Sequence, residues 1–471
     1  MSPTPAGPSP WVARAASLAL ALAIWFVPPP EGLTLEAWRL FAIFLSAIVS
    51  VILGAFPILT ASAFAVAAAV LSGLLTPEQA YGGFANSTIL LIVMAFLVAR
   101  AVVKSGLGLR LGHLAVSRFG RSTLGLSYSI FLVDAVIAPA FPSNTARAGV
   151  LYPLVVGLAE AGGVTPGNPA RRRLGAYLMF SGMVSLSVSS ALWLTAMVAN
   201  PLGSEIARSA GVEITFASWL VASSIPTLTA MLVLPWVLQR LMSPEVTSTP
   251  DAPAAARRAL AERGPLSRDE WIVAMTFVGM VGLWAGAAFI GLDSTAIAFL
   301  GLGVLLATGV LTAGDIAKEG DVLATFIWFA VLFTLSGQLN EMGFMGFLGE
   351  RLAGALGGFG PIPAYVLLLV AYILLHYLFV SQTAHVLALF GVFLDVGVKL
   401  GLPAAPFAFM LLFASNFFSV IAPQGSSANL LFTGSGYLSQ GELYRLGAIT
   451  TGITLVIYLV VATPWLMFVA R

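Results

Sequence analysis

The chain contains no cysteine, only 3 histidines and few charged residues for its length of 471. Without cysteine it can form no disulfide, no thiolate metal site and no thiol nucleophile. Three histidines supply a zinc or di-iron site poorly. Charged residues make up 9% of the chain, against about 25% in a soluble globular domain, so most of the surface is expected not to face water. The formal net charge of +2 is too small to indicate nucleic acid as a partner.

The chain is rich in apolar residues, which make up 59% of the sequence. A membrane-spanning helix needs about 20 mostly apolar residues, and the apolar segments here suffice for about eleven full crossings. The first span is expected near residues 11–27 and is expected to be kept, because a basic n-region and a cleavage site are lacking. The segments 124–141 and 361–379 end in polar triplets, which favours re-entrant hairpins or broken helices. We therefore predict an all-α polytopic membrane protein.

Three short matches recur in order at nearly one spacing, which predicts an internal duplication. They pair residues 106–112 with 343–349, residues 143–146 with 381–384, and residues 189–191 with 426–428. The offsets are 237, 238 and 237 residues. The matches alone leave open whether the two copies are parallel or inverted.

Two polar clusters interrupt apolar sequence at equivalent positions of the two predicted copies. A helix that starts after such a break has free backbone N–H groups, which with hydroxyl and amide side chains can bind an anion. Two clusters could hold the two ends of a dicarboxylate, although serine and threonine also cap broken helices in membranes. The substrate-binding candidates are Ser143, Asn144 and Thr145 in the first cluster, and Ser381, Gln382 and Thr383 in the second.

A second pair of polar breaks is expected to form the opposite wall of the same site. Its substrate-binding candidates are Ser189, Ser190, Ser426, Ser427 and Asn429. Ser189 suits a role in helix packing equally well.

A base follows the leading serine of each cluster by four residues, Arg147 in the first and His385 in the second. A charge at membrane depth costs at least ~2.5–3.5 kcal/mol on insertion scales, so it is usually functional or paired. We interpret both as charge-compensating residues near an anion site, with Asp134 a candidate partner of Arg147. Arg147 could instead reach an interface, and His385 could be a neutral core histidine. No metal or cofactor is expected.

At these residues the chain resembles a known family. The two triplets resemble the paired Ser-Asn-Thr signatures of the divalent anion/sodium symporter (DASS) family. Further runs resemble one branch, which holds bacterial citrate/succinate and tartrate/succinate antiporters and plastid 2-oxoglutarate/malate translocators. These runs lie at residues 84–89, 104–108, 123–129, 142–149 and 264–270.

The resemblance implies a fold of two inverted repeats, with re-entrant helical hairpins tipped by the triplets and with broken helices. It also implies a homodimeric scaffold and a transport domain that moves as an elevator. In sodium-coupled members, cations bind beside both triplets and substrate binds between them. Gln382 and the pair Ala428-Asn429 depart from the sodium-coupled pattern, which favours the exchanger branch.

The longest polar stretch, residues 242–270, divides the chain and is expected on the cytoplasmic side because it carries several arginines. We accordingly predict N-terminal scaffold spans (1–85), a first repeat (86–241), a cytoplasmic linker (242–270), connecting spans (271–322) and a second repeat (323–471).

The function predicted is secondary active transport rather than catalysis. We expect exchange of di- and tricarboxylates, such as citrate, succinate, malate, 2-oxoglutarate and tartrate, by sodium-independent antiport in a bacterial-type inner membrane. Arg147 stays charged at accessible pH, so an empty site would carry its charge through a low-dielectric barrier. A sodium- or proton-coupled symporter of the same anions is the alternative. A passive channel would need a basic ring along a pore, and an enzyme a nucleophile with a base at usable spacing.

Overall fold

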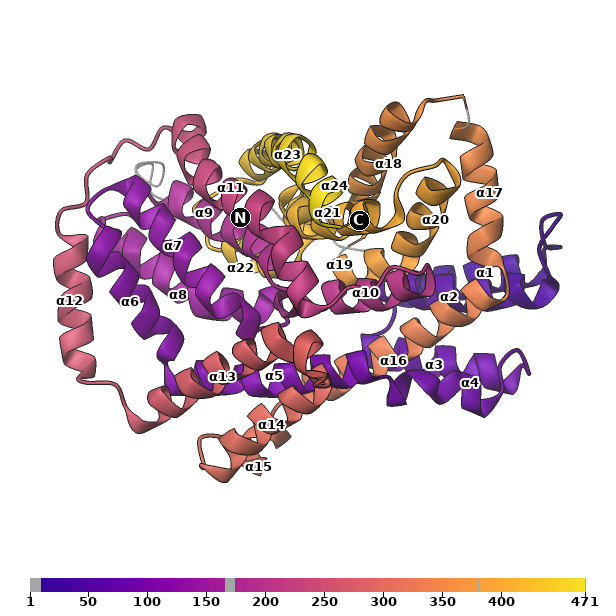
Figure 1. The fold of residues 1–471 in the computed structure, drawn as a ribbon, viewed down its shortest axis with the longest axis horizontal. Coiled ribbons are helices and arrows are strands. Elements are labelled where there is room, and N and C mark those ends of the chain that lie inside the picture. The colour runs from indigo at the N-terminus through magenta and orange to yellow at the C-terminus, as the bar shows by residue number, and fades with distance from the viewer. Residues whose placement is uncertain (1–9, 166–173, 357, 380, 471) are drawn as a thin grey trace.

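The structure is a computed structural model that describes residues 10–165, 174–356, 358–379 and 381–470. Over these residues the chain is helical, with turns, short loops and one isolated bridge between Ser122 and Ser248, and it contains no strand. Figure 1 shows the helices in several layers, with α5 and α16 crossing below the hairpins that carry the polar triplets. The all-helical prediction is confirmed.

The helices fall into two runs separated by the polar linker. The first run comprises α1 (Pro10–Phe26), α2 (Leu35–Ile52), α3 (Ile58–Leu71), α4 (Pro77–Tyr81), α5 (Ser87–Ser105), α6 (Leu107–Phe119), α7 (Thr123–Ile137), α8 (Asn144–Ala161), α9 (Gly175–Leu192), α10 (Ala199–Ser209) and α11 (Phe216–Met242). The second run comprises α12 (Ala252–Arg263), α13 (Arg268–Ile290), α14 (Ser294–Ala307), α15 (Ala313–Ala317), α16 (Gly320–Glu341), α17 (Phe344–Leu356), α18 (Pro361–Leu375), α19 (Gln382–His385), α20 (Gly391–Lys399), α21 (Ala404–Phe417), α22 (Ser427–Thr433), α23 (Gln440–Ile457) and α24 (Thr463–Val469).

Short turns of tighter or wider helix mark the places where the long helices break. The 3₁₀ turns are η1 (Gly82–Ala85), η2 (Ala138–Ala140), η4 (Leu194–Ala196), η5 (His376–Leu378), η7 (Phe418–Val420) and η8 (Pro423–Gly425). Two π-helical turns are η6 (Val386–Phe390) and η9 (Tyr458–Ala462). Turns of these kinds often occur at functional sites, and η2, η5 and η6 flank the two polar clusters.

Ten helices among the described residues are long and apolar enough to cross a membrane, and four shorter apolar helices accompany them. Their outward faces are apolar, as on α13, where Val278 is 68% exposed and Phe289 84%. Contiguous exposed apolar surface is typical of a face that contacts lipid. Arms of hairpins and broken helices are among the ten, so the number of full crossings expected from the sequence stays a prediction.

Both polar triplets lie at the turns of helical hairpins. In the first hairpin, α7 and η2 lead to the turn and α8 leads away, and α18, η5 and the helix from Gln382 do the same in the second. The side chain of Ser143 accepts the backbone N–H of Ala146, and that of Ser381 accepts the N–H of Ala384, both at 3.3 Å. Each serine is therefore the N-cap that starts its returning helix. Figure 1 shows the two hairpins on opposite sides of the molecular centre.

Each hairpin is followed by a broken helix that one buried asparagine stabilises. The amide of Asn200, in α10, donates to the carbonyls ten and seven residues earlier in the chain, at 2.9 and 3.2 Å. The amide of Asn429, in α22, donates to carbonyls at the same two spacings, at 2.8 and 3.2 Å. Identical bonding makes these two residues structural equivalents, 229 residues apart.

The third sequence match, of residues 189–191 with 426–428, is therefore wrong. Ser189 and Ser190 lie in α9 before the first break, whereas Ser426 and Ser427 lie after the second break, at the start of α22. Residues 162–174 separate α8 from α9, but only residues 400–403 separate α20 from α21. This difference of nine residues accounts for the change in offset from 238 at the hairpins to 229 at the breaks.

The linker 242–270 is folded against the first hairpin's supporting helix. Helix α12 packs along α6, and Arg257 donates to the carbonyl of Ser117 at 3.4 Å. Arg110 of α6 pairs with Glu270 at 2.8 Å and donates to the carbonyl of Gly264 at 2.9 Å. The polar stretch therefore holds α6 to the start of α13 and does not form a loose tether.

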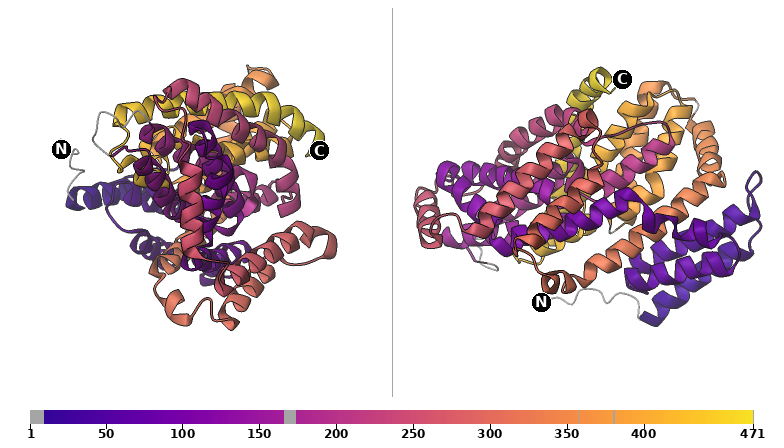
Figure 2. Two further views of the ribbon diagram at one scale, coloured as in Figure 1. Left: turned by 90° about the vertical axis from the view of Figure 1, so that its left-hand side faces the viewer. Right: turned by 60° about the horizontal axis from the view of Figure 1, so that its bottom comes forward.

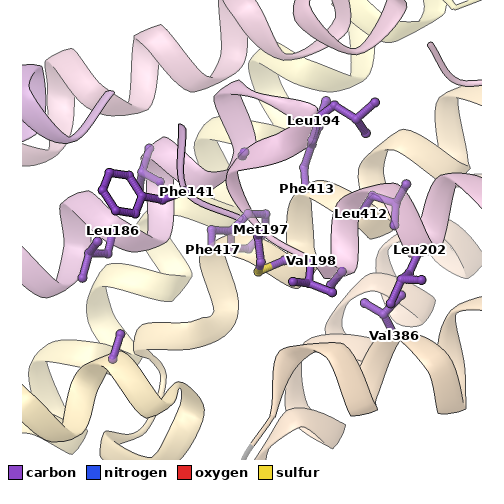
Figure 3. Packing of buried hydrophobic residues seen from close by; sticks show 14 of the residues in the cluster. Phe141, Leu186, Leu194, Met197, Val198, Leu202, Val386, Leu412, Phe413 and Phe417 are labelled. Carbon is purple, nitrogen blue, oxygen red and sulfur yellow. The ribbon is translucent and has the colours of Figure 1, made fainter. Parts of the chain in front are cut away.

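One apolar core runs through most of the described helices, and the two halves of the chain interlock in it around α10. Figure 3 shows Leu202, Leu412 and Val386 close together there, on α10, α21 and η6. A Cβ on Gly203 would lie 2.2 Å from a methyl carbon of Leu412, so only glycine allows α10 to approach α21 this closely. Figure 2 shows α1–α3 grouped at one end of the molecule, apart from the C-terminal helices.

Candidate functional site

A cavity of about 460 Å³ lies where the two hairpin turns meet. On the hairpin side it is lined by Pro142, Ser143, Asn144, Thr145, Met197, Val198, Ser381, Gln382, Thr383, Ala384, Ser426 and Ser427. The facing wall comes from α2, α3, α5, α16 and the turn after α2, and comprises Val51, Ile52, Gly54, Ile58, Phe96, Thr325, Trp328 and Phe329. The structure thus brings both triplets to one cavity, as the sequence predicted. Their role in binding substrate stays a prediction.

The two turns contact each other directly at this cavity. The amide nitrogen of Asn144 donates to the amide oxygen of Gln382 at 3.1 Å, across 238 residues of sequence. The hydroxyls of Thr145 and Ser427 lie 2.7 Å apart and share a hydrogen bond. Gln382 also donates to the carbonyl of Ser415 at 2.8 Å. These bonds fix the two amides, so the remaining hydroxyls and the free N–H groups of the first helical turns are available to a ligand.

Arg147 lies behind the first turn and does not line the cavity. Its guanidinium is fully buried and is surrounded by five oxygen atoms, which we call the oxygen cage. The cage comprises Asp134 Oδ1 at 3.2 Å, Ser189 Oγ at 2.7 Å, Asn144 Oδ1 at 2.5 Å, the carbonyl of Leu186 at 3.0 Å, and Ser190 Oγ. The carboxylate of Asp134 balances the charge, so the expectation of an uncompensated cation facing the anion is corrected. Arg147 instead fixes the orientation of Asn144.

His385 also lies away from the cavity. Its ring is fully buried, with centroids 4.4 Å from the Tyr372 ring and 4.7 Å from the Phe418 ring. Neither ring nitrogen has a hydrogen-bond partner among the described residues. The structure therefore favours a core histidine, and the expectation of a charge facing the substrate at His385 is not supported by its position.

Three of the five candidates from the second pair of polar segments do not lie where the sequence predicted. Ser189 and Ser190 are fully buried beneath the first turn, where their hydroxyls bond to Asp134 and Asn144, respectively. Asn429 is 2% exposed and spans the second break. None of the three lines the cavity, and each bonds to groups behind it. Ser426 and Ser427 do line it.

The charge that the cavity offers an anion comes from backbone dipoles. Among the described lining residues there is no lysine, arginine, histidine, aspartate or glutamate. The N-termini of α8, of α10 and of the continuous helical segment 382–399 all begin at the cavity. Helix N-termini carry partial positive charge and free N–H donors. The site can therefore bind carboxylate oxygens at two or more separate places without a fixed cation.

Sequence reasoning missed the start of α10 and the facing wall. Met197 and Val198 line the cavity beside the first break. A weak signal was present, because the dipeptide Ala-Asn occurs three times, as Ala85-Asn86, Ala199-Asn200 and Ala428-Asn429, and the last two are the equivalent pair. The wall residues Phe96 and Trp328 carry no comparable signal, since both are apolar residues within mainly apolar stretches of α5 and α16.

The family model described as the sodium:sulfate symporter transmembrane region matches residues 9–471. With its ten candidate spans, the chain is therefore a multi-pass membrane protein, and it belongs to the DASS family. YflS, a candidate malate transporter of Bacillus subtilis, is 40% identical over 95% of this chain and 94% of its own length. Dicarboxylate transporter 1 of Arabidopsis thaliana chloroplasts is 37% identical over 99% of this chain and 86% of its own.

Two further comparisons concern a curated relative and a solved structure. The L-tartrate/succinate antiporter of Shigella sonnei is 32% identical over 97% of this chain and 98% of its own length. The crystal structure of the Alcanivorax borkumensis YdaH transporter superposes with a TM-score of 0.61 at 16% identity, covering 92% of this chain and 98% of that chain. At that identity the likeness concerns the fold alone.

Proposed function

We propose that this protein is a secondary active transporter that exchanges di- or tricarboxylates across the membrane. The observation that carries the proposal is the convergence of both triplets on one cavity. Each triplet begins a helix, so two sets of hydroxyls and N–H groups face the same space from opposite halves of the chain. This arrangement suits an anion with a carboxylate at each end. The relatives named as transporters of malate, other dicarboxylates, tartrate and succinate support it.

The oxygen cage around Arg147 supports sodium-independent antiport. A carboxylate, an amide oxygen, a carbonyl and two hydroxyls are ligands of the kind that hard metal cations bind. The guanidinium already fills this space, so no mobile cation is needed there to orient Asn144. A carrier without a coupling cation depends on the substrate itself to permit reorientation, which gives exchange. The antiporter among the relatives agrees with this assignment.

The cavity lies between two structural groups, which supports an elevator mechanism. The hairpins and broken helices form one side, and α2, α3, α5 and α16 form the other. We propose that the first group moves as the transport domain against the second, which serves as scaffold. In this scheme 1–85 and 271–322 belong to the scaffold, 86–241 and 323–471 are inverted repeats, and 242–270 is cytoplasmic. A homodimer in a bacterial inner membrane completes the proposal.

Alanine substitution of the two turn serines tests the binding site. Ser143→Ala and Ser381→Ala each remove a hydroxyl that lines the cavity, and hydrogen bonds to charged groups contribute about 1.5–3 kcal/mol. Each variant should therefore raise the KM for succinate exchange in proteoliposomes by about tenfold or more. Ser224→Ala is the matched control, because Ser224 is half-buried, lies outside the cavity lining and donates only to the carbonyl of Val221 within its own helix. Unchanged KM values in both turn variants would contradict the assignment.

A further inference from the structure

One wall of the cavity differs in chemistry from the two turns. The wall formed by α2, α3, α5 and α16 is lined mainly by aliphatic and aromatic side chains. Among its described lining residues, Thr325 of α16 provides the one hydroxyl, and its neighbours Trp328 and Phe329 are aromatic. This wall belongs to neither hairpin, so it faces the cavity from a third direction. Figure 1 shows α16 crossing beneath the hairpins.

Among the described residues, Thr325 has an unpartnered hydroxyl, as do Thr450 and Thr451 of α23, but unlike them it lines the cavity. Thr229 and Thr308 each donate to the carbonyl four residues earlier, at 2.7 and 2.8 Å. Thr454 does the same at 2.8 Å. No such bond, and no other hydrogen bond of Thr325, occurs within the described part of the chain, and its side chain is half-buried. It can therefore donate to, and accept from, a molecule in the cavity.

We infer that Thr325 is a specificity-determining residue that binds a hydroxyl on the central carbons of the substrate. The inference rests on the proposed function. If the two turns hold the two terminal carboxylates, the carbons between them must face a surface that is neither turn, and the α16 wall is such a surface. The apolar wall packs against methylene groups, and Thr325 pairs with a 2-hydroxyl. The substrate class selected is therefore 2-hydroxy C4 dicarboxylates over the unsubstituted diacid.

Competition measurements on Thr325→Val test the inference. The full-length protein is reconstituted with internal succinate, and uptake of labelled succinate is inhibited by external succinate, malate or tartrate. Valine keeps the shape of threonine but removes the hydroxyl. The preference for malate over succinate should fall by about two- to tenfold, as expected for one neutral hydrogen bond, while the KM for succinate stays within about twofold. The preference for tartrate over succinate should fall by at least the same factor, because tartrate carries two hydroxyls.

Two further variants keep the inference falsifiable. Thr325→Ser retains the hydroxyl and should retain the malate preference, and it serves if the valine variant does not fold. Thr308→Val is a control, because Thr308 lies at the end of α14 and does not line the cavity. If Thr325→Val leaves the preference for malate over succinate unchanged, or weakens the binding of both acids equally, the inference about Thr325 is overturned. The proposed function would still stand. A wild-type protein that exchanges no dicarboxylate would overturn the proposed function as well.

Discussion

At the scale of single residues, Arg147 and Asp134 form a fully buried ion pair behind the site. Both side chains are fully buried, and each also bonds to a hydroxyl or an amide in the oxygen cage. Burying two ions costs several kcal/mol each, which their attraction offsets only when the remaining donors and acceptors are satisfied. Here one guanidinium nitrogen, Nε, lacks a partner in the described residues, and the others are bonded.

Removing one member of this pair should destabilise the protein more than removing both. Asp134→Ala leaves a buried guanidinium unpaired and should cost about 3–5 kcal/mol. The double variant Asp134→Leu with Arg147→Met replaces both ions by apolar groups of similar size and should recover most of that loss. Unfolding of the detergent-solubilised protein by heat or denaturant measures both. Equal destabilisation in the single and double variants would show that the ion pair is not the source of the effect.

The residues of the turns were predictable from sequence, but the direction of the serines in α9 was not. Polar triplets after an apolar segment mark a turn without knowledge of packing, and Ser143 and Ser381 do line the cavity. Ser189 and Ser190 are equally polar in the sequence. Whether they face a ligand or a neighbouring helix depends on where the helix breaks, and the break comes after Leu192.

At the scale of helices, one close contact joins the N-terminal spans to α16. The N–H of Gly83, in η1, donates to the hydroxyl of Thr334 at 2.9 Å. A Cβ on Gly83 would lie 2.2 Å from the backbone oxygen of Ala330, which cannot move without disturbing α16. The adjacent Gly82 has no atom within 4 Å of the position that its Cβ would occupy. The two glycines therefore differ in packing although they are neighbours.

This difference predicts opposite outcomes for two alanine substitutions. Gly83→Ala should separate η1 from α16 and destabilise the protein by about 1–3 kcal/mol, the usual cost of overpacking. Gly82→Ala should be neutral or slightly stabilising, because alanine reduces the conformational freedom of the unfolded chain. Thermal unfolding of the two variants in the same detergent compares them. Equal stability of the two variants would contradict the packing described here.

The hairpins were predictable at this scale, whereas the equivalence of the broken helices was not. The offset of 238 residues between Ser143 and Ser381 holds throughout both hairpins, because their helices are equally long. A constant offset then fails at the breaks, since the connections that follow α8 and α20 differ in length. Loop lengths vary without affecting the core, and so a search for repeats at one spacing pairs the wrong residues beyond them.

At the scale of the whole molecule, the two halves of the chain contact each other at the cavity. The hydroxyls of Thr145 and Ser427, from the two halves, are 2.7 Å apart. The native chain has no cysteine, so introduced cysteines can pair only with each other. Side chains whose terminal atoms lie this close are compatible with the short Cβ–Cβ distance of a disulfide.

A cysteine pair therefore tests whether the halves meet as described. Thr145→Cys with Ser427→Cys should form a disulfide upon mild oxidation in membranes. Non-reducing peptide mapping should then recover the two segments as one linked species, which reduction separates. Each single-cysteine variant is the control and should give no linked species from within one chain. Failure of the pair to link under conditions that oxidise exposed cysteines would show that the first turn lies apart from the start of α22.

The central claim is that one cavity, with a guanidinium built in behind it, exchanges carboxylates without a coupling cation. The most direct measurement is uptake of labelled succinate into proteoliposomes prepared with and without internal succinate, in sodium and in sodium-free potassium medium. We expect uptake to require internal succinate and to be equal in the two media. Uptake into vesicles without internal carboxylate, driven by an inward sodium gradient, would contradict the account.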